Sequence, residues 1–192
     1  LAVVFPPLVK NAFHAQKDVA SVFLAIFSVG IAIGSVIINR LLKGEVSARY
    51  GVVSVLAMAA FVVDFHFASL GWPISEGPLL KTHEFLAQPH IVRVLFDLAM
   101  IAITGGMFVV PLYAFLTTTV DQSQTARTVA ANNIVNSGAM VVGSVGIFAL
   151  TQLGMHVLGG LWVVFGLCIL SAVASWHLHR AGDTPREEHV DE

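Results

Sequence analysis

Charged side chains are scarce in this chain of 192 residues: Asp, Glu, Lys and Arg together make up only 11% of it. A soluble domain carries about a quarter, so this chain cannot cover an aqueous surface in the usual way. Hydrophobic residues make up 56% instead, and their surplus apolar surface has to face lipid. The formal net charge of -2 is too small to attract a polyanion, so we expect no nucleic-acid partner.

Cysteine is almost absent as well, since Cys168 is the single one and stands in an apolar run. One cysteine excludes an internal disulfide and a CxxC zinc site, and we expect Cys168 to fill space in the core. The sequence also lacks a GxxxxGK(S/T) loop and the HExxH, GxSxG and GxGxxG motifs. We therefore expect no enzymatic activity, no cofactor and no metal site.

Long apolar runs are what the chain has in abundance. Five of them have the length of a helix that crosses about 30 Å of hydrocarbon: residues 19–42, 51–70, 91–116, 129–153 and 157–178. Residues 1–10 correspond to the last turns of another span, which Pro6 and Pro7 end. The sequence predicts an all-α fold, a polytopic membrane bundle of five complete spans and the end of another over residues 1–180. Residues 181–192 are predicted to be a charged cytoplasmic tail.

The basic residues indicate which way the spans run. Three of them crowd into the short link 39–51, and short links rich in Lys and Arg stay in the cytoplasm. The first complete span then runs inward and the second returns outward. Because the five complete spans alternate in this way, the last one also runs inward, and the C-terminus is expected to be cytoplasmic. The inner set is Arg40, Lys43, Arg49, Arg127, Arg180 and Arg186, and the outer set is Lys10, Lys17, Lys81 and Arg93.

The link 71–90 is the longest between the spans, and its prolines prevent one continuous helix. Two interpretations stay open for it. It is either a plain loop or a short helix that lies in the interface, with Trp72 at headgroup depth. One face of such a helix would hold Leu79, Leu80, His83 and Leu86.

Four ionisable side chains stand inside the spans: Asp64 and His66 on the second, and Arg93 and Asp97 on the third. Arg93 and Asp97 are four residues apart, so they share a helix face and can pair. Asp64 and Asp97 both lie about 10 Å deep from the outer side, so a cluster with Arg93 is geometrically possible. Such residues are functional-site candidates; the alternatives are a structural ion pair or an Arg93 that snorkels to the headgroups. We expect His66 to be a hydrogen-bonded structural histidine rather than a proton relay.

The stretch 105–146 is predicted to contain the end of one span, a polar turn and the start of the next. The turn covers 117–128 and holds one cation, Arg127. Three amides open the following span, namely Asn132, Asn133 and Asn136. Because amides are costly in lipid, we interpret them as the polar start of a helix that lines a pathway. Capping and interhelical hydrogen bonds are the alternative.

Parts of the chain resemble the major facilitator superfamily. The eighth span and basic loop of that family are similar to residues 24–51, LAIFSVGIAIGSVIINRLLKGEVSARYG. The tenth and eleventh spans of its lysophospholipid transporter branch closely resemble residues 105–120 and 126–144, GGMFVVPLYAFLTTTV and ARTVAANNIVNSGAMVVGS. The similarity covers nearly all of residues 1–180. The branch includes membrane domains fused to acyltransferase and acyl-ACP ligase modules.

The resemblance implies half of a major facilitator fold, in which two halves alternately open a central site to either side of the membrane. This chain corresponds to the C-terminal half, and its implied function is to move lysophospholipid or a related amphiphile across the bacterial inner membrane. The amides and Arg127 would then meet the headgroup. Its implied partners are membrane lipids, the missing N-terminal half of the same transporter, and an acyltransferase or acyl-ACP ligase. The alternative is a non-transporting membrane module that anchors a phospholipid acyltransferase system.

Small residues add one expectation about packing. Gly30 and Gly34 form a GxxxG pair, which lets another helix approach closely. In a half-bundle the central face has no partner, so we expect Gly30, Gly34 and Gly143 to lack close neighbours. We also expect the purified chain alone to aggregate or dimerise and not to transport.

Overall fold

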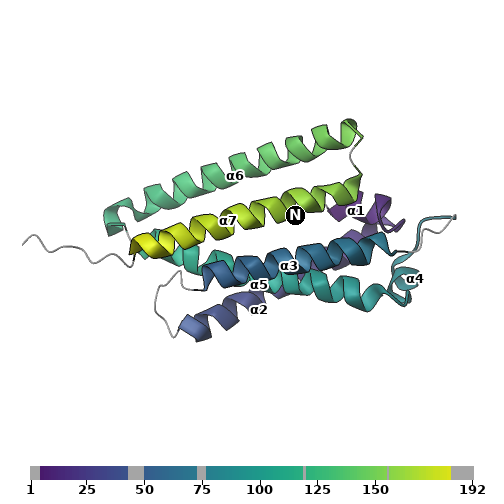
Figure 1. The fold of residues 1–192 in the computed structure, drawn as a ribbon, viewed down its shortest axis with the longest axis horizontal. Coiled ribbons are helices and arrows are strands. Elements are labelled where there is room, and N and C mark those ends of the chain that lie inside the picture. The colour runs from purple at the N-terminus through teal and green to yellow at the C-terminus, as the bar shows by residue number, and fades with distance from the viewer. Residues whose placement is uncertain (1–4, 43–49, 73–76, 119, 155, 183–192) are drawn as a thin grey trace, which may run out of the picture.

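A computed structural model describes residues 5–42, 50–72, 77–118, 120–154 and 156–182 of the chain. Within those ranges the protein is built from helices (Figure 1), which confirms the all-α class. The elements in chain order are α1 (Phe5–Asn11), α2 (Lys17–Leu42), α3 (Gly51–Leu70), α4 (Thr82–Leu86), α5 (Ile91–Thr118), α6 (Gln122–Gln152), the short η1 (Val157–Gly159) and α7 (Gly160–Gly182).

Five of these helices, α2, α3, α5, α6 and α7, are long and apolar enough to cross a membrane. The described part of the chain therefore has the five spans that the sequence predicts. In Figure 1 the C-terminal ends of α2, α5 and α7 lie at the same end of the bundle as the N-terminal ends of α3 and α6. The short helices α1 and α4 lie at the opposite end. Lys43, Arg49 and Arg186, which carry part of the predicted orientation, lie outside the described residues, as does the tail beyond Gly182.

Two predicted boundaries are wrong. The helix α1 continues past Pro6 and Pro7 to Asn11, because proline is tolerated in the first turn of a helix, where its missing N–H has no partner to lose. The polar turn expected at 117–128 is much shorter, since α5 ends at Thr118 and α6 begins at Gln122. Residues 122–128 contain neither glycine nor proline, and a helix that leaves the hydrocarbon can continue in water. Arg127 therefore lies on a helix.

The contact between α2 and α5 is the closest in the bundle. A Cβ atom added to Gly30 would lie 2.6 Å from the Cβ of Ala102, and one added to Gly34 would overlap the backbone carbonyl of Ile103. On the other side of the contact, a Cβ at Gly106 would lie 2.6 Å from the carbonyl oxygen of Ile31. The GxxxG pair thus lets the two backbones meet, as predicted, and the expectation that both glycines lack close neighbours is wrong. They pack inside this chain.

An aromatic cluster closes the end of the bundle where α1 and α4 lie. The ring of Phe13 is fully buried and meets those of Trp72 and Phe85 at centroid distances of 5.0 Å and 5.7 Å. Phe23 of α2 and Phe65 of α3 complete the cluster around it. Edge-to-face contacts of this kind add to the free energy of burial.

The structure shows how the link 71–90 packs. Trp72 is 4% exposed and lies inside the aromatic cluster. The short helix α4 is present, but its buried side chain is Phe85, whereas Leu86 and His83 are exposed.

Two links are joined beside the aromatic cluster. The amide of Gln16 donates to the carbonyl of Leu80, and the amide of Leu80 donates to the carbonyl of His14, both at 2.9 Å. His14 adopts a φ of 48°, a left-handed conformation that a residue with a Cβ rarely takes. Its Nε2 also lies 2.8 Å from the carbonyl oxygen of Gly77. The link after α1 and the link before α4 are therefore held as one unit.

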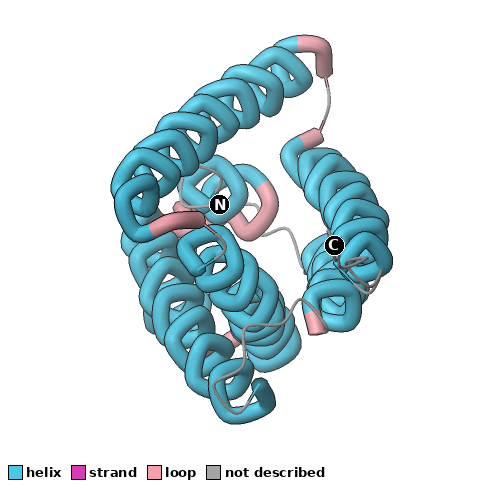
Figure 2. The backbone as a smooth tube through the Cα atoms, turned by 90° about the vertical axis from the view of Figure 1, so that its left-hand side faces the viewer, coloured by secondary structure: helices cyan, strands magenta, loops and turns pink. Residues whose placement is uncertain are grey.

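The helix α7 packs on α3. Cys168 is buried in a small cluster with Val55, Ala59 and Ala172, so it fills space in the core as predicted. By contrast, none of the residues of α6 is buried, and Figures 1 and 2 show this helix set apart from α7. A Cβ at Gly143 of α6 would meet no atom within 4 Å. The expectation that Gly143 lacks a close neighbour is confirmed.

Several hydroxyl side chains within the spans find acceptors in their own helix, whereas the buried Ser54 has no partner among the described residues. Thr104 donates to the carbonyl oxygen of Met100 at 2.7 Å, and Ser69 donates to that of Phe65 at the same distance. Ser28 and Ser35 bond the carbonyls one turn earlier in α2, each at 2.8 Å. These bonds remove the cost of a polar group in an apolar helix.

Replacing Gly34 with alanine tests the contact between α2 and α5. The new methyl group meets backbone, which cannot rotate away, so the helices have to separate; overpacking of this kind costs about 1–3 kcal/mol. We expect a lower thermal midpoint for Gly34→Ala in detergent. The matched control is Gly143→Ala, which adds the same methyl group to an open helix surface and should not lower the midpoint. Equal midpoints for the two variants would contradict the close contact.

Candidate functional site

Polar side chains in the spans gather in two places. The first is the interface of α3 and α5, where Asp64, Arg93 and Asp97 lie, and the second is the N-terminal half of α6, which carries Arg127 and the three amides. The helices α3 and α5 are otherwise largely apolar, whereas the N-terminal half of α6 also carries Gln, Ser and Thr. Each polar group therefore has to be accounted for by a partner or by an opening.

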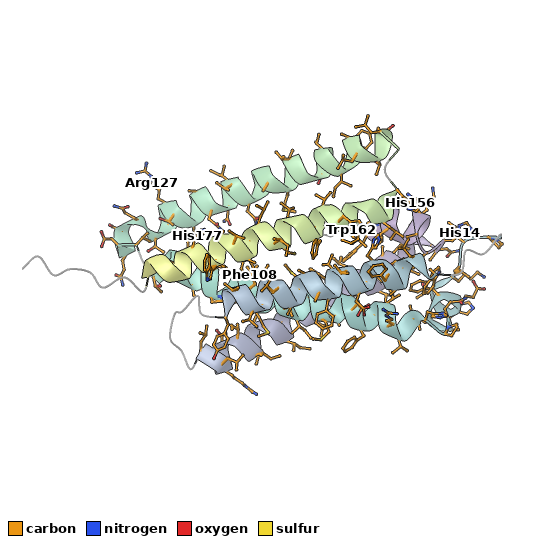
Figure 3. The ribbon with its side chains drawn as sticks, viewed as in Figure 1. His14, Phe108, Arg127, His156, Trp162 and His177 are labelled. Carbon is orange, nitrogen blue, oxygen red and sulfur yellow. The ribbon has the colours of Figure 1, made fainter. Side chains whose placement is uncertain are left out.

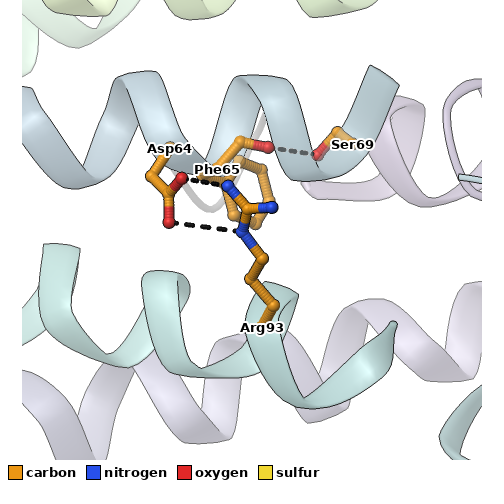
Figure 4. A network of polar contacts seen from close by, with 4 residues as sticks. All are labelled: Asp64, Phe65, Ser69 and Arg93. Carbon is orange, nitrogen blue, oxygen red and sulfur yellow. Dashed lines mark hydrogen bonds and ion pairs between the residues drawn. The ribbon is translucent and has the colours of Figure 1, made fainter. Parts of the chain in front are cut away.

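Arg93 of α5 reaches across to Asp64 of α3 (Figure 4). Its Nη2 contacts Oδ1 of Asp64, and its Nε donates to Oδ2 at 3.4 Å. The two bonds form a fork, which is the geometry in which a guanidinium binds a carboxylate most strongly. The side chains of Arg93 and Asp64 are 56% and 44% exposed, so the pair lies on the surface of the five-helix bundle.

The ion pair also lies within the candidate membrane spans α3 and α5. Asp64 is six residues before the end of α3, which is about 9 Å along the helix axis. Arg93 is near the start of α5 and its long side chain points back across the interface toward Asp64 (Figure 4). An Arg that only snorkels would extend toward the headgroups instead of binding a carboxylate on the neighbouring helix.

Asp97 is the third member of the predicted cluster, and its surroundings differ from those of Asp64. Its side chain is fully buried, and neither carboxylate oxygen has a hydrogen-bond partner among the described residues. The predicted pairing of Arg93 with Asp97 within α5 is therefore wrong. The physical reason is the order of the two residues, since a cation that precedes an acid by one turn is the weaker arrangement on a helix, and Asp64 offers both oxygens.

His66 connects α3 to the start of α7. It is 8% exposed, and its Nδ1 lies 3.1 Å from the carbonyl oxygen of Leu158 in η1. Because a carbonyl can only accept, Nδ1 carries the proton and donates it. The imidazole also meets the ring of Trp162 edge to face at 5.2 Å. His66 is hydrogen-bonded, as predicted, but the sequence could not reveal its partner, because that acceptor belongs to the backbone.

The amides of α6 are not covered by the other described helices. Asn132 is half-buried, and Asn133 and Asn136 are exposed. Asn132 and Asn136 share one face, which is also that of the half-buried Thr125 and Thr128. The alternative of capping does not apply to them, because α6 begins ten residues before Asn132.

Arg127 does not belong to the amide face. At about 100° per residue, it is turned by about 140° from Asn132 and about 180° from Asn136. Figure 3 shows its side chain pointing away from the other helices. The sequence interpretation brought Arg127 and the amides together because it placed Arg127 in a flexible turn. The continuous helix separates them.

The fold defines the class: the chain is a multi-pass helical membrane protein. No protein-family model matches it, and neither a curated protein nor a solved structure does. The candidate site consists of a half-exposed ion pair between α3 and α5, the buried Asp97 of α5, and a face of amides on α6, which is a helix with no buried residue.

The ion pair can be tested by removing one partner and then the other. In Arg93→Ala the carboxylate of Asp64 loses its cation inside the span, so we expect a lower thermal midpoint in detergent. Adding Asp64→Asn should partly restore the midpoint, because a neutral amide needs no cation. Arg40→Ala, which removes an exposed cation at the end of α2, is the control. An Arg93→Ala protein as stable as this control would show that Arg93 does not hold the helices together.

The connection through His66 makes a separate prediction. His66→Phe keeps the ring contact with Trp162 and removes the donor to Leu158, so it should cost about 1–3 kcal/mol through the carbonyl left unpaired. The readout is the midpoint temperature at which α7 separates from α3. The fluorescence of Trp162 reports this separation in a protein in which Trp72 and Trp176 are replaced. His83→Phe changes an exposed histidine and should have no effect. A midpoint unchanged in both variants would contradict the interhelical bond.

Proposed function

We propose that this chain is the C-terminal half of a secondary transporter of the major facilitator type, which moves a lysophospholipid or related amphiphile across a bacterial inner membrane. One observation carries the proposal. The ion pair of Asp64 and Arg93 is about half exposed on the surface of the five-helix bundle, within the candidate spans α3 and α5. Lipid cannot solvate such a pair, so another protein surface or a water-filled path has to meet it.

The amide face of α6 supports the same proposal. The helix α6 has no buried residue and carries three amides. Contact between lipid and the face with these amides is unfavourable, because each amide would lose its hydrogen bonds to water. A second half of the transporter, packed against the open surface, provides both a neighbour for α6 and a polar path between the halves. The resemblance of residues 126–144 to the lysophospholipid transporter branch supports the assignment of the substrate.

A lysophospholipid fits what the described spans offer. It has one acyl chain and a zwitterionic or anionic headgroup. Apolar side chains line most of the open surface, as the exposed Ile134, Val141 and Phe148 of α6 illustrate, and they suit the acyl chain. The amides of Asn132 and Asn136 can donate to the headgroup phosphate. A diacyl lipid needs a second apolar path, so we propose that it moves more slowly.

The test uses the protein purified from its native membrane in mild detergent, through a tag at the C-terminal end, so that any attached segments stay present. Labelled lysophosphatidylethanolamine is compared with its diacyl counterpart and with a sugar in proteoliposomes. We expect the lysolipid to cross fastest. Asn132→Leu should slow it about fivefold, since one lost hydrogen bond is worth about 1 kcal/mol.

Arg127→Gln serves as the matched control on the same helix. Because Arg127 faces away from the amides, it should slow the lysolipid much less than Asn132→Leu does. Equal movement of the sugar would remove the substrate assignment. No lysolipid movement, together with an acyl-transferring protein that copurifies in stoichiometric amount, would favour the alternative of a module that anchors an acyltransferase system.

A further inference from the structure

Two carboxylates and a single cation meet where α3 packs on α5. The cation, Arg93, is bound to Asp64. The second acid, Asp97, is one helical turn further along α5 and fully buried, and neither of its oxygens has a hydrogen-bond donor among the described residues. It shares a helix face with Arg93, which precedes it by four residues. Among the described side chains, the cluster therefore holds one buried carboxyl group without a donor.

The charges of Asp64, Arg93 and Asp97 sum to zero only when one of the two acids is protonated. If both acids are ionised, the three groups carry a net charge of -1, and the uncompensated charge falls on the buried Asp97. A buried ion without a partner costs several kcal/mol even after the protein relaxes, whereas a neutral carboxylic acid costs much less. One proton on Asp97 makes the cluster neutral and leaves the observed bond between Arg93 and Asp64 intact.

The other helices packed against α5 do not alter this balance. Between Asp18 and Arg40, α2 carries no charged or titratable side chain. The charged or titratable side chains of α3 are Asp64 and His66, and His66 is bound to the carbonyl of Leu158 on the side of α7. Arg127 of α6 is near the opposite end of the bundle (Figure 3), and Asp121 directly precedes the same helix. Among the described residues, the groups that face Asp97 are therefore Asp64 and Arg93.

We propose that Asp97 is a proton-binding site, and that its occupancy decides which carboxylate Arg93 binds. The site is derived from the geometry of α3 and α5, and its coupling to lipid movement rests on the proposed function. A proton is the ligand that a single carboxyl group can take. A metal cation such as Na⁺ or Ca²⁺ needs several oxygen ligands around it.

The exchange proceeds in one balanced step. With the proton on one oxygen of Asp97, the acid is neutral and Arg93 stays on Asp64. When the O–H bond breaks, the electron pair remains on Asp97 and the proton passes to water that enters at the half-exposed ion pair. Arg93 shares a helix face with the new carboxylate and turns to it. Asp64 is then released, so the contact that holds α3 to α5 at this point opens, and protonation of Asp97 closes it again.

Infrared spectroscopy of the reconstituted protein detects the proton directly. A protonated carboxylic acid gives a carbonyl stretching band that an ionised carboxylate lacks, and a buried acid without donors gives it at high frequency. We expect this band in the wild-type protein at neutral pH, with loss of the band as the pH is raised. Asp97→Asn should abolish the band. Asp18→Asn, which changes an exposed acid on α2, should leave it unchanged.

The conservative variants identify which acid holds the proton. Asp97→Glu keeps a carboxyl group and should shift the band, whereas Asp64→Glu should not. Absence of the band from the wild-type protein at all pH values would overturn the proposal. So would a band that shifts only in Asp64→Glu, or one that disappears on addition of Na⁺ at constant pH. Circular dichroism confirms that each variant is folded before its spectrum is compared.

A second measurement separates the proton site from the proposed function. In proteoliposomes of the native-membrane protein, an imposed pH gradient should accelerate lysolipid movement in the wild type, whereas the rate in Asp97→Asn should not respond to the gradient. A band at Asp97 without acceleration by the gradient supports the site and excludes its coupling to transport. An accelerated Asp97→Asn protein would show that another group couples the proton.

Discussion

The direct backbone contact between α2 and α5 is the constraint on which the other packing depends. Gly34 allows α2 to reach the carbonyl of Ile103, and Gly106 of α5 allows the reciprocal approach to Ile31. In a membrane the hydrophobic effect does not drive helices together, so close van der Waals contact has to hold them. With α5 fixed on α2, its opposite face is presented to α3, and Arg93 comes within reach of Asp64. The position of the polar cluster therefore depends on the glycines in the contact between α2 and α5.

The described bundle is well packed on one side and open on the other. Around α2, α3 and α5 it has a continuous core with an aromatic cluster at one end, whereas α6 has no buried residue. Several hydroxyl groups in the spans bond carbonyls of their own helix and need no neighbour. The amides of α6 are on a helix with no buried residue, where a further surface would meet them. The pair of Asp64 and Arg93 is half exposed where α3 packs on α5.

Much of this arrangement could be predicted from the sequence, and the failures have physical causes. The five spans follow from the length and composition of the apolar runs. A close helix contact at Gly30 follows from its spacing to Gly34, but the spacing does not reveal that α5 makes it. The partner of Arg93 could not be derived, because spacing within one helix does not reveal what the neighbouring helix offers. Arg127 was misplaced because polar composition does not distinguish a turn from a helix that extends into water.

The bonds between the links beside the aromatic cluster have a mechanical consequence. Gln16, Leu80 and His14 tie the segments that enter α2 and precede α5, and Phe13 packs α2, α3 and α4 together at the same level. A displacement of the segment that enters α2 is therefore transmitted to the segment before α4, because backbone hydrogen bonds and the buried ring of Phe13 join the two at the end of the bundle where α1 and α4 lie (Figure 1).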